Sequence, residues 1–153
     1  MMNELIHDTT LYENIPSGEG RLPREMEVYK LLEQLNIPFK RMDHEPMATI
    51  EACQGVDKIL GIHMCKNLFL CNSQKTVFYL HISPGAVSVM GLMNDKDNHV
   101  NLLIDEDVLK EEFLGCHPCV NTASLRIKTS DVIEKFLPFT AHEYQSVHLT
   151  GED

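Results

Sequence analysis

Two apolar runs, Asn67-Leu-Phe-Leu-Cys71 and Thr76-Val-Phe-Tyr-Leu80, decide the fold class of this chain. Both are rich in residues that favour β-strands, and the polar segment Cys71-Asn-Ser-Gln-Lys75 between them has the composition of a hairpin turn. We therefore expect two neighbouring strands here, with further elements on both sides.

The N-terminal side of these strands combines helical and strand patterns. Apolar residues recur at helical spacing over 24–36, and the stretch 39–43 is typical of a strand. Thr49 is a suitable cap for a second helix over 49–61, which Gly55 could interrupt. Residues 1–21 show little periodicity, and we treat them as an N-terminal extension.

The C-terminal side continues in the same mixed manner. After a Pro/Gly stretch over 83–91, a strand is expected over 98–104. Asp105 then caps a helix whose inward side holds Val108, Leu109 and Phe113, and Gly115 ends that helix.

The last third of the chain predicts two strands with a helix between them. The strands are expected over 122–128 and 143–149, and the helix begins at Thr129 or Ser130 and ends at Pro138. Strands and helices alternate without a regular βαβ repeat, which indicates one mixed α+β (or α/β) domain.

The composition limits the classes of function. The 153 residues have no apolar run long enough for a bilayer and no export signal at the start, so we expect a soluble cytoplasmic protein. Five cysteines fit reduced thiols better than a disulfide framework. A net charge of -10 argues against a general nucleic-acid binder, although an enzyme could still grip one end of an RNA.

The segment Gly115-Cys-His-Pro-Cys119 contains a C-x-x-C pattern, which elsewhere indicates zinc or redox chemistry. A structural zinc needs a second pair of ligands, and Cys65 and Cys71 are poorly spaced for that role. We therefore favour two cysteines packed near a turn. Gly115 and Pro118 would stiffen a loop that holds His117 just before Asn121-Thr-Ala-Ser124, and such loops suit a carbonyl or oxyanion.

Two further polar positions have both a plain and a functional interpretation. Lys66 precedes a strongly apolar strand, where it could simply reach solvent or could place a cation at the mouth of a pocket. Asn94-Asp95 is either an ordinary polar turn or part of a site.

These segments occur in an order that resembles the YbaK/ProX family of aminoacyl-tRNA deacylases, in particular its ProX type. The resemblance covers the chain from about Leu22 to the C-terminus, so the domain is expected over 22–153. It rests on the following stretches: Val28-Tyr-Lys-Leu-Leu, His44-Glu-Pro, Gly61-x-His63-x-x-Lys66-Asn-Leu-Phe-Leu70, Gly91-Leu-x-Asn94-Asp95, Val100 to Asp105-Glu-Asp107, and Gly115-x-His117-Pro-x-x-Asn121-Thr-Ala.

The resemblance implies hydrolysis of mischarged Ala-tRNA(Pro) to alanine and free tRNA, without metal or cofactor. It implies a mixed, mostly antiparallel central sheet flanked by helices. The implied partner is the acceptor end of aminoacylated tRNA, with transient contact to prolyl-tRNA synthetase also conceivable, and neither a membrane nor DNA is involved.

The resemblance also implies roles for individual residues. Lys66, His117 and Gly115 form the catalytic set, with Lys66 on the terminal phosphate or ribose and the other two orienting the ester carbonyl. The attacking group is expected to be a water, partly activated by the ribose hydroxyl of the substrate. The substrate-binding set is Asn67, Asn94, Asp95, Pro118, Asn121, Thr122 and Ala123.

The chain departs from the family in one place. A strand, a helix and a strand that usually precede the segment matching Pro84-Gly-Ala-Val are missing, so that two family segments nearly touch around 81–83. We expect residues to be missing from the sequence here, because a real loss would expose core and sheet edges. A chain break near Ile82 would show this.

Three alternatives remain open at this point. A Cys-tRNA(Pro) deacylase is the nearest, and hydrolysis of Cys-tRNA without Ala-tRNA would indicate it. A non-catalytic tRNA-binding module on the same fold would bind tRNA without turnover. A zinc or thiol-redox protein would use Cys116 and Cys119.

Overall fold

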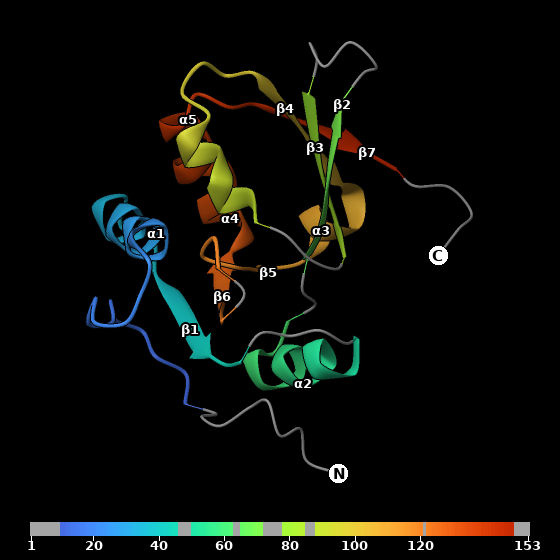
Figure 1. The fold of residues 1–153 in the computed structure, drawn as a ribbon. Coiled ribbons are helices and arrows are strands. Elements are labelled where there is room, and N and C mark those ends of the chain that lie inside the picture. Colours follow the sequence, from blue (N-terminus) through green and yellow to red (C-terminus); the bar gives the residue numbers. More distant parts are fainter. Residues whose placement is uncertain are drawn as a thin grey trace.

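The structure is a computed structural model that describes residues 10–45, 50–62, 65–71, 78–84, 88–120 and 122–148. Over 50–54, 65–71 and 78–84 it describes the backbone alone. Helices and strands are interspersed along the chain, as Figure 1 shows, and the predicted mixed α+β class is confirmed.

The first sheet is antiparallel and has the order β1-β6-β5. Its strands are β1 (Phe39–Asp43), β5 (Phe113–Cys116) and β6 (Ala123–Lys128). Alternate residues of β6, namely Ala123, Leu125 and Ile127, are fully buried, which is the period expected of a strand with one face on the core.

The second sheet has the order β2-β3-β4-β7. The strands β2 (Cys65–Cys71) and β3 (Phe78–Pro84) pair antiparallel, as predicted. β3 then pairs parallel with β4 (Val100–Asp105), and β4 pairs parallel with β7 (Tyr144–Val147). The strands of the described residues thus form two sheets where one central sheet was expected.

Two helices confirm the N-terminal predictions. Helix α1 (Pro23–Gln34) begins with a proline, which lacks the N–H that a first helical turn leaves unpaired, and buries Val28 and Leu32. Helix α2 (Ile50–Leu60) runs through Gly55 without the suggested break and ends before Gly61, whose φ of 73° suits glycine. The proposed cap Thr49 lies outside the described residues.

The segment after Asp105 differs from its prediction. The Asp105 carboxylate does accept a hydrogen bond from the Asp107 N–H, but helix α3 (Glu106–Lys110) is short. Phe113 and Gly115 lie in β5, opposite Lys128 and Arg126 of β6. The prediction of Gly115 as a helix end was therefore wrong, because pairing with β6 satisfies this backbone as a strand.

The C-terminal helical run is continuous from Thr129 to Phe139. It consists of α4 (Thr129–Asp131), the π-helical turn η2 (Val132–Phe136) and α5 (Leu137–Phe139). The predicted end at Pro138 is slightly early, because the Leu137 N–H bonds to the Val132 carbonyl five residues back and α5 accommodates the proline in its first turn. Neither predicted side-chain cap is formed at its start.

His81 and Ile82 lie within β3, and the expectation that residues are missing from the sequence near Ile82 stays a prediction. His81 and Ile82 pair with Leu68 and Asn67 on one side and with Leu103 and Ile104 on the other. β2 and β4 thus pair with both edges of β3, so neither edge of this strand is exposed.

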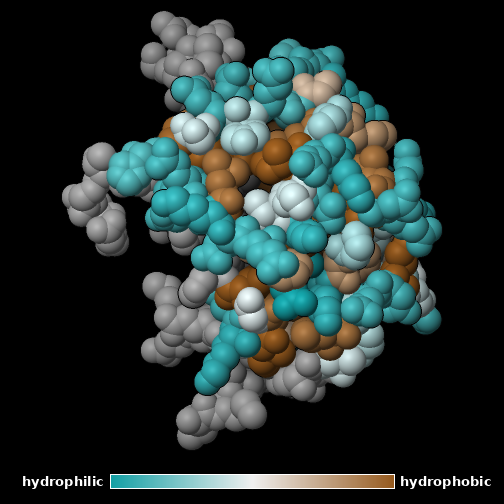
Figure 2. Space-filling view, turned by 180° about the vertical axis from the view of Figure 1, so that it is seen from behind, coloured by the Kyte–Doolittle hydropathy of each residue, from teal (hydrophilic) through white to brown (hydrophobic). Residues whose placement is uncertain are grey.

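The main core brings α1, the 3₁₀-helix η1 (Val89–Asn94), both sheets and the C-terminal helical run together. Its fully buried side chains include Tyr29, Leu32, Leu125 and Phe136. The rear face of the molecule is predominantly hydrophilic with separate hydrophobic patches (Figure 2). No helix in the described part of the chain is long and apolar enough to cross a membrane.

Candidate active site

The loop between β5 and β6 carries His117, and two neighbouring elements hold it through hydrogen bonds to its carbonyls. The Ser88 hydroxyl, at the start of η1, donates to the carbonyl of His117. The Arg24 Nε–H, at the start of α1, donates to the Cys119 carbonyl over 2.9 Å. Cys119 has a φ of 62°, a left-handed conformation that turns the chain sharply. The predicted rigid loop is thus present, but Cys119 makes the unusual turn that was assigned to Gly115.

The His117 ring is fixed in one tautomer by its partner. Its Nδ1 lies 2.9 Å from the Ala123 carbonyl oxygen, and a carbonyl can only accept, so Nδ1 carries the hydrogen. In a neutral imidazole the other nitrogen, Nε2, then has the free lone pair. His117 is half-buried, so this lone pair can act as a proton acceptor for a group bound beside the loop.

A second histidine, His44, lies against His117. The two ring centroids are 6.3 Å apart with an interplanar angle of 71°. The Ser124 hydroxyl lies 2.8 Å from His44 Nε2 and 3.5 Å from His117 Nδ1. His44 also ties the end of β1 to the start of β6, since its backbone N–H donates to the Thr122 carbonyl over 2.9 Å.

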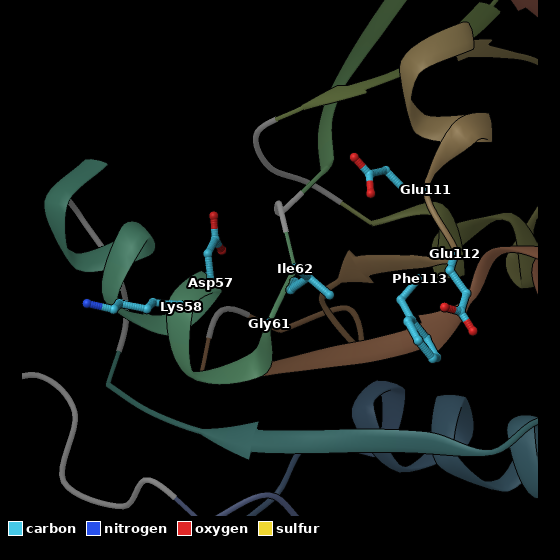
Figure 3. A pocket seen from close by; sticks show the side chains of 7 residues that line it. All are labelled: Asp57, Lys58, Gly61, Ile62, Glu111, Glu112 and Phe113. Atoms are coloured by element: carbon cyan, nitrogen blue, oxygen red, sulfur yellow. The ribbon is translucent and has the colours of Figure 1, made fainter.

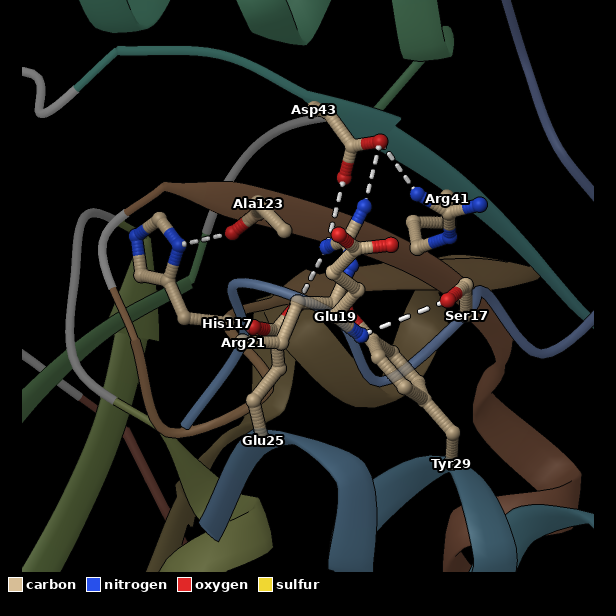
Figure 4. A network of polar contacts seen from close by, with 9 residues as sticks. All are labelled: Ser17, Glu19, Arg21, Glu25, Tyr29, Arg41, Asp43, His117 and Ala123. Atoms are coloured by element: carbon tan, nitrogen blue, oxygen red, sulfur yellow. Dashed lines mark hydrogen bonds and ion pairs between the residues drawn. The ribbon is translucent and has the colours of Figure 1, made fainter. Parts of the chain in front are cut away.

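The charges beside this site are paired among themselves. Asp43, at the end of β1, binds the guanidinium groups of Arg21 and Arg41, and Arg21 also binds Glu25 (Figure 4). Burial alone would raise the pKa of Asp43, but the hydrogen bonds from the two arginines outweigh it and lower that pKa. The two arginines and two carboxylates of this network balance in charge, and the network holds the N-terminal segment on β1.

The burial of His44 favours its neutral form. Burial lowers the pKa of His44, and the nearby His117 lowers it further, against the opposing effect of the Glu45 carbonyl and the Asp43 and Glu45 charges. His44 is 7% exposed and Ser124 is 1% exposed, so protein groups satisfy the hydrogen-bonding atoms of both side chains.

Lys66 and Asn67 are placed by backbone alone. They lie in β2, opposite Ser83 and Ile82 of β3, and β2 lies close to β5, the strand that leads into the His117 loop. The fold thus brings the predicted lysine strand and the histidine loop together. The side chains of both residues, and all of Asn121, lie outside the described part.

Asn94 and Asp95 lie at the far end of η1 from Ser88. At about 2 Å per residue, the six residues of this 3₁₀-helix separate its ends by about 12 Å. The Asp95 carboxylate accepts hydrogen bonds from the backbone of His99 and Val100 and from His142 Nε2, the last over 2.8 Å. Through these hydrogen bonds Asp95 anchors the loop before β4, and none of its described contacts is with His117.

The other predicted binding residues shape the loop from within. Pro118 is buried and Ala123 is 0% exposed, so Ala123 contributes its carbonyl oxygen to His117. Thr122 is exposed at the start of the same segment.

Comparison with known proteins places this loop in a known family. The sequence profile of the aminoacyl-tRNA editing domain matches residues 56–135, just over half of the chain, and this range includes Lys66 and His117. The chain belongs to the aminoacyl-tRNA editing domain family. It is therefore an aminoacyl-tRNA deacylase, a hydrolase whose partner is aminoacylated tRNA.

One curated relative is similar in sequence, and two solved structures are similar in fold alone. The editing domain is 24% identical to the prolyl-tRNA editing protein ProX of Acetoanaerobium sticklandii, over 77% of this chain and 93% of the relative. The fold of this chain is similar to the crystal structure of hypothetical protein APE2540, with a TM-score of 0.53 and 11% identity. The match covers 71% of this chain and 92% of that one. A computationally designed epitope scaffold has a TM-score of 0.51 and 14% identity, over 82% of this chain and 97% of its own.

Sequence reasoning missed three residues of this site in the editing domain. His44 stood in a quoted family segment without a role, Ser124 was noted only as the end of a motif, and Arg24 was noted only as the start of a helix. Their contacts span 80, 7 and 95 positions of the chain, so no local pattern could reveal the first and last.

A separate cavity of about 390 Å³ lies between the end of α2 and the start of β5 (Figure 3). Its lining includes the carboxylates of Asp57, Glu111 and Glu112, and Lys58 is the single basic residue among the lining residues. The C-terminal end of α2 adds partial negative charge. This cavity is therefore unsuited to a phosphate group.

No disulfide joins the two cysteines of the C-x-x-C pattern, and both lie in or against the main core. Cys116 is buried in the main core, and Cys119 packs against it. Burial raises the pKa of the Cys119 thiol, which disfavours the reactive thiolate. Among the described residues, no three His, Cys, Asp or Glu side chains gather as metal ligands.

Proposed function

We propose that this deacylase clears alanine from Ala-tRNA(Pro), releasing alanine and free tRNA(Pro). The similarity to a prolyl-tRNA editing protein over 93% of that relative supports prolyl-tRNA as the substrate class. A synthetase pocket for proline discriminates against a smaller apolar side chain by only about 1–3 kcal/mol, so a second hydrolytic site is needed. Such a site admits alanine and excludes proline by size.

The reaction we propose uses His117 as a proton acceptor. A water attacks the ester carbonyl, the bond to the ribose oxygen breaks, and that oxygen receives the proton taken up by His117, which regenerates the ribose hydroxyl. His117 Nε2 takes the proton from the attacking water, directly or through a ribose hydroxyl of the terminal adenosine. Backbone groups of the loop from Gly115 to Cys119 orient the carbonyl, and Lys66 contacts the terminal phosphate. Partial exposure of the fixed His117 tautomer is the observation that carries this mechanism.

The experiment compares three substrates, Ala-tRNA(Pro), Pro-tRNA(Pro) and Cys-tRNA(Pro), and measures release of the labelled amino acid. We expect rapid loss of alanine while proline is spared. Hydrolysis of Cys-tRNA(Pro) without Ala-tRNA(Pro) would replace the proposal by the cysteinyl alternative.

The proposed phosphate contact has its own variant. Lys66→Ala should strongly reduce hydrolysis of Ala-tRNA(Pro) while the thermal midpoint stays unchanged, because a lysine at a strand end contributes little to the core. Lys58→Ala is the matched control, since Lys58 is an exposed lysine at the acidic cavity. Full activity of Lys66→Ala would remove Lys66 from the site.

A further inference from the structure

We infer that His44 is a positioning residue for the reaction: by orienting the Ser124 hydroxyl, it adds a second acceptor at His117 Nδ1 and so reinforces the tautomer, set by the Ala123 carbonyl, whose Nε2 accepts a proton. This inference deepens the proposed function and rests on it for the role of His117. It concerns the end of β1, a part of the chain that precedes the matched family segment.

The direction of each hydrogen bond follows from the groups involved. His44 Nδ1 lies 2.8 Å from the Glu45 carbonyl oxygen, so this nitrogen carries a hydrogen and donates it. In the neutral ring, His44 Nε2 is then an acceptor, and the Ser124 O–H donates to it over 2.8 Å. The hydroxyl hydrogen of Ser124 therefore points away from His117.

This orientation leaves the oxygen lone pairs of Ser124 facing His117. His117 Nδ1 is 3.5 Å from that oxygen and 2.9 Å from the Ala123 carbonyl oxygen, so both neighbours of Nδ1 are acceptors. An imidazole with two acceptors at Nδ1 keeps its hydrogen there. The hydrogen is thereby kept off Nε2, which remains the basic nitrogen.

A protonated His44 would reverse the arrangement. Its Nε2–H would donate to Ser124, and the hydroxyl hydrogen would then be free to turn toward His117 Nδ1, where a hydrogen already lies. The groups facing His44 are Asp43 of β1, the adjacent Glu45, His117 of the loop and Ser124 of β6. Burial is the largest effect and disfavours charge on His44, and it outweighs the Glu45 carbonyl and the Asp43 and Glu45 charges, which favour that charge.

Three substitutions in the full chain separate this role from simple packing. Ser124→Ala removes the hydroxyl, and His44→Leu removes the acceptor while keeping an apolar side chain of similar size. His44→Gln offers an amide oxygen to the Ser124 hydroxyl and serves as the conservative variant. His99→Gln is the control, because His99 is exposed and its described hydrogen bond uses its backbone.

Two measurements are made on each variant. Nitrogen NMR of isotopically labelled histidine reports which nitrogen of His117 carries the hydrogen, and single-turnover and steady-state hydrolysis of Ala-tRNA(Pro) report kcat and KM. We expect Nδ1–H in the wild type and in His44→Gln, and a minor share of Nε2–H in the other two site variants, where the Ala123 carbonyl remains as the single acceptor at Nδ1. We expect kcat to fall roughly fivefold to tenfold in Ser124→Ala and His44→Leu, with KM unchanged, since one net hydrogen bond is worth about this factor.

The inference is overturned if His117 of the wild type carries its hydrogen on Nε2, or if Ser124→Ala and His44→Leu keep both the tautomer and kcat of the wild type. A loss of activity that His44→Gln shares fully, with an unchanged tautomer, also overturns it, because that pattern indicates packing. The NMR measurement needs no substrate, so absence of hydrolysis by the wild type would count against the proposed function and not against the tautomer assignment.

Discussion

The Ser124 hydroxyl lies between two imidazoles in a position that is almost completely buried. Burial of a polar group without a hydrogen bond costs about 1–3 kcal/mol, so this arrangement is stable only while each donor meets an acceptor. At the residue scale, the protonation state of His44 is therefore linked both to the geometry of His117 and to the stability of the fold.

This linkage predicts a pH dependence of stability. Burial lowers the pKa of His44 below its ordinary value of 6.5, so the unfolded chain takes up the proton first. The stability that neutral His44 contributes is complete above pH 6.5 and is lost as the pH falls below it. We expect His44→Gln to lose less free energy of unfolding than the wild type between about pH 7.5 and about pH 5.5. Urea unfolding at the two pH values measures this, and equal losses would contradict it.

At the element scale, the loop between β5 and β6 is fixed by neighbouring elements and not by its own sequence. Ser88 of η1 and Arg24 of α1 each donate to a loop carbonyl, and β6 supplies the Ala123 carbonyl to His117. These three contacts from outside the loop therefore fix the position of the imidazole.

Arg24 tests this account of the loop. Arg24→Gln removes the Nε–H donor to the Cys119 carbonyl, and we expect kcat for Ala-tRNA(Pro) to fall roughly threefold to tenfold. Because Arg24 is exposed, the free energy of unfolding should change by less than about 0.5 kcal/mol. Lys30→Gln, which removes another exposed cation of α1, is the control and should keep wild-type kcat. Unchanged kcat in Arg24→Gln would show that the Arg24 hydrogen bond is not needed to position the loop.

The sequence predicted most elements and the composition of the loop, but not the partners that fix it. Helical spacing identified α1, and alternation of apolar residues identified β1 and β6. Phe113 and Gly115 were assigned to a helix because Val108, Leu109 and Phe113 fit one helical face, whereas pairing with β6 decides their conformation. The family resemblance implied Asp95 as a binding residue, which stays a prediction; no local pattern predicted that its carboxylate accepts a hydrogen bond from His142, 47 positions away.

At the scale of the whole molecule, the N-terminal segment is joined to the domain beside the site. The backbones of Tyr12 and Arg41 exchange two hydrogen bonds, and the Arg41 guanidinium lies 4.5 Å from the Tyr12 ring centroid. Arg21 then bridges Glu25 of α1 and Asp43 of β1. The residues expected to form an extension of uncertain order thus pack, over 10–21, against the strand that leads to His44.

Arg21 is the residue on which this attachment depends most. Arg21→Met should lower the free energy of unfolding by about 2 kcal/mol, because it leaves the Asp43 and Glu25 carboxylates with fewer donors. The arginines lower the pKa of Asp43, so their contribution is present above its ordinary value of 3.8 and is lost as the pH falls below it. Urea unfolding of both proteins at neutral pH measures the difference, and Lys40→Met, at an exposed ion pair, serves as the control. A difference within experimental error would show that the network contributes nothing to stability.

The central claim is that this acidic editing domain hydrolyses its substrate at the His117 loop. Single-turnover hydrolysis of Ala-tRNA(Pro) by His117→Ala tests it most directly. Loss of the proton acceptor should reduce the rate at least about 100-fold, with the thermal midpoint within a few degrees of the wild type, because His117 is only half-buried. A rate within about twofold of the wild type would contradict the account and would place the reacting centre elsewhere in the domain.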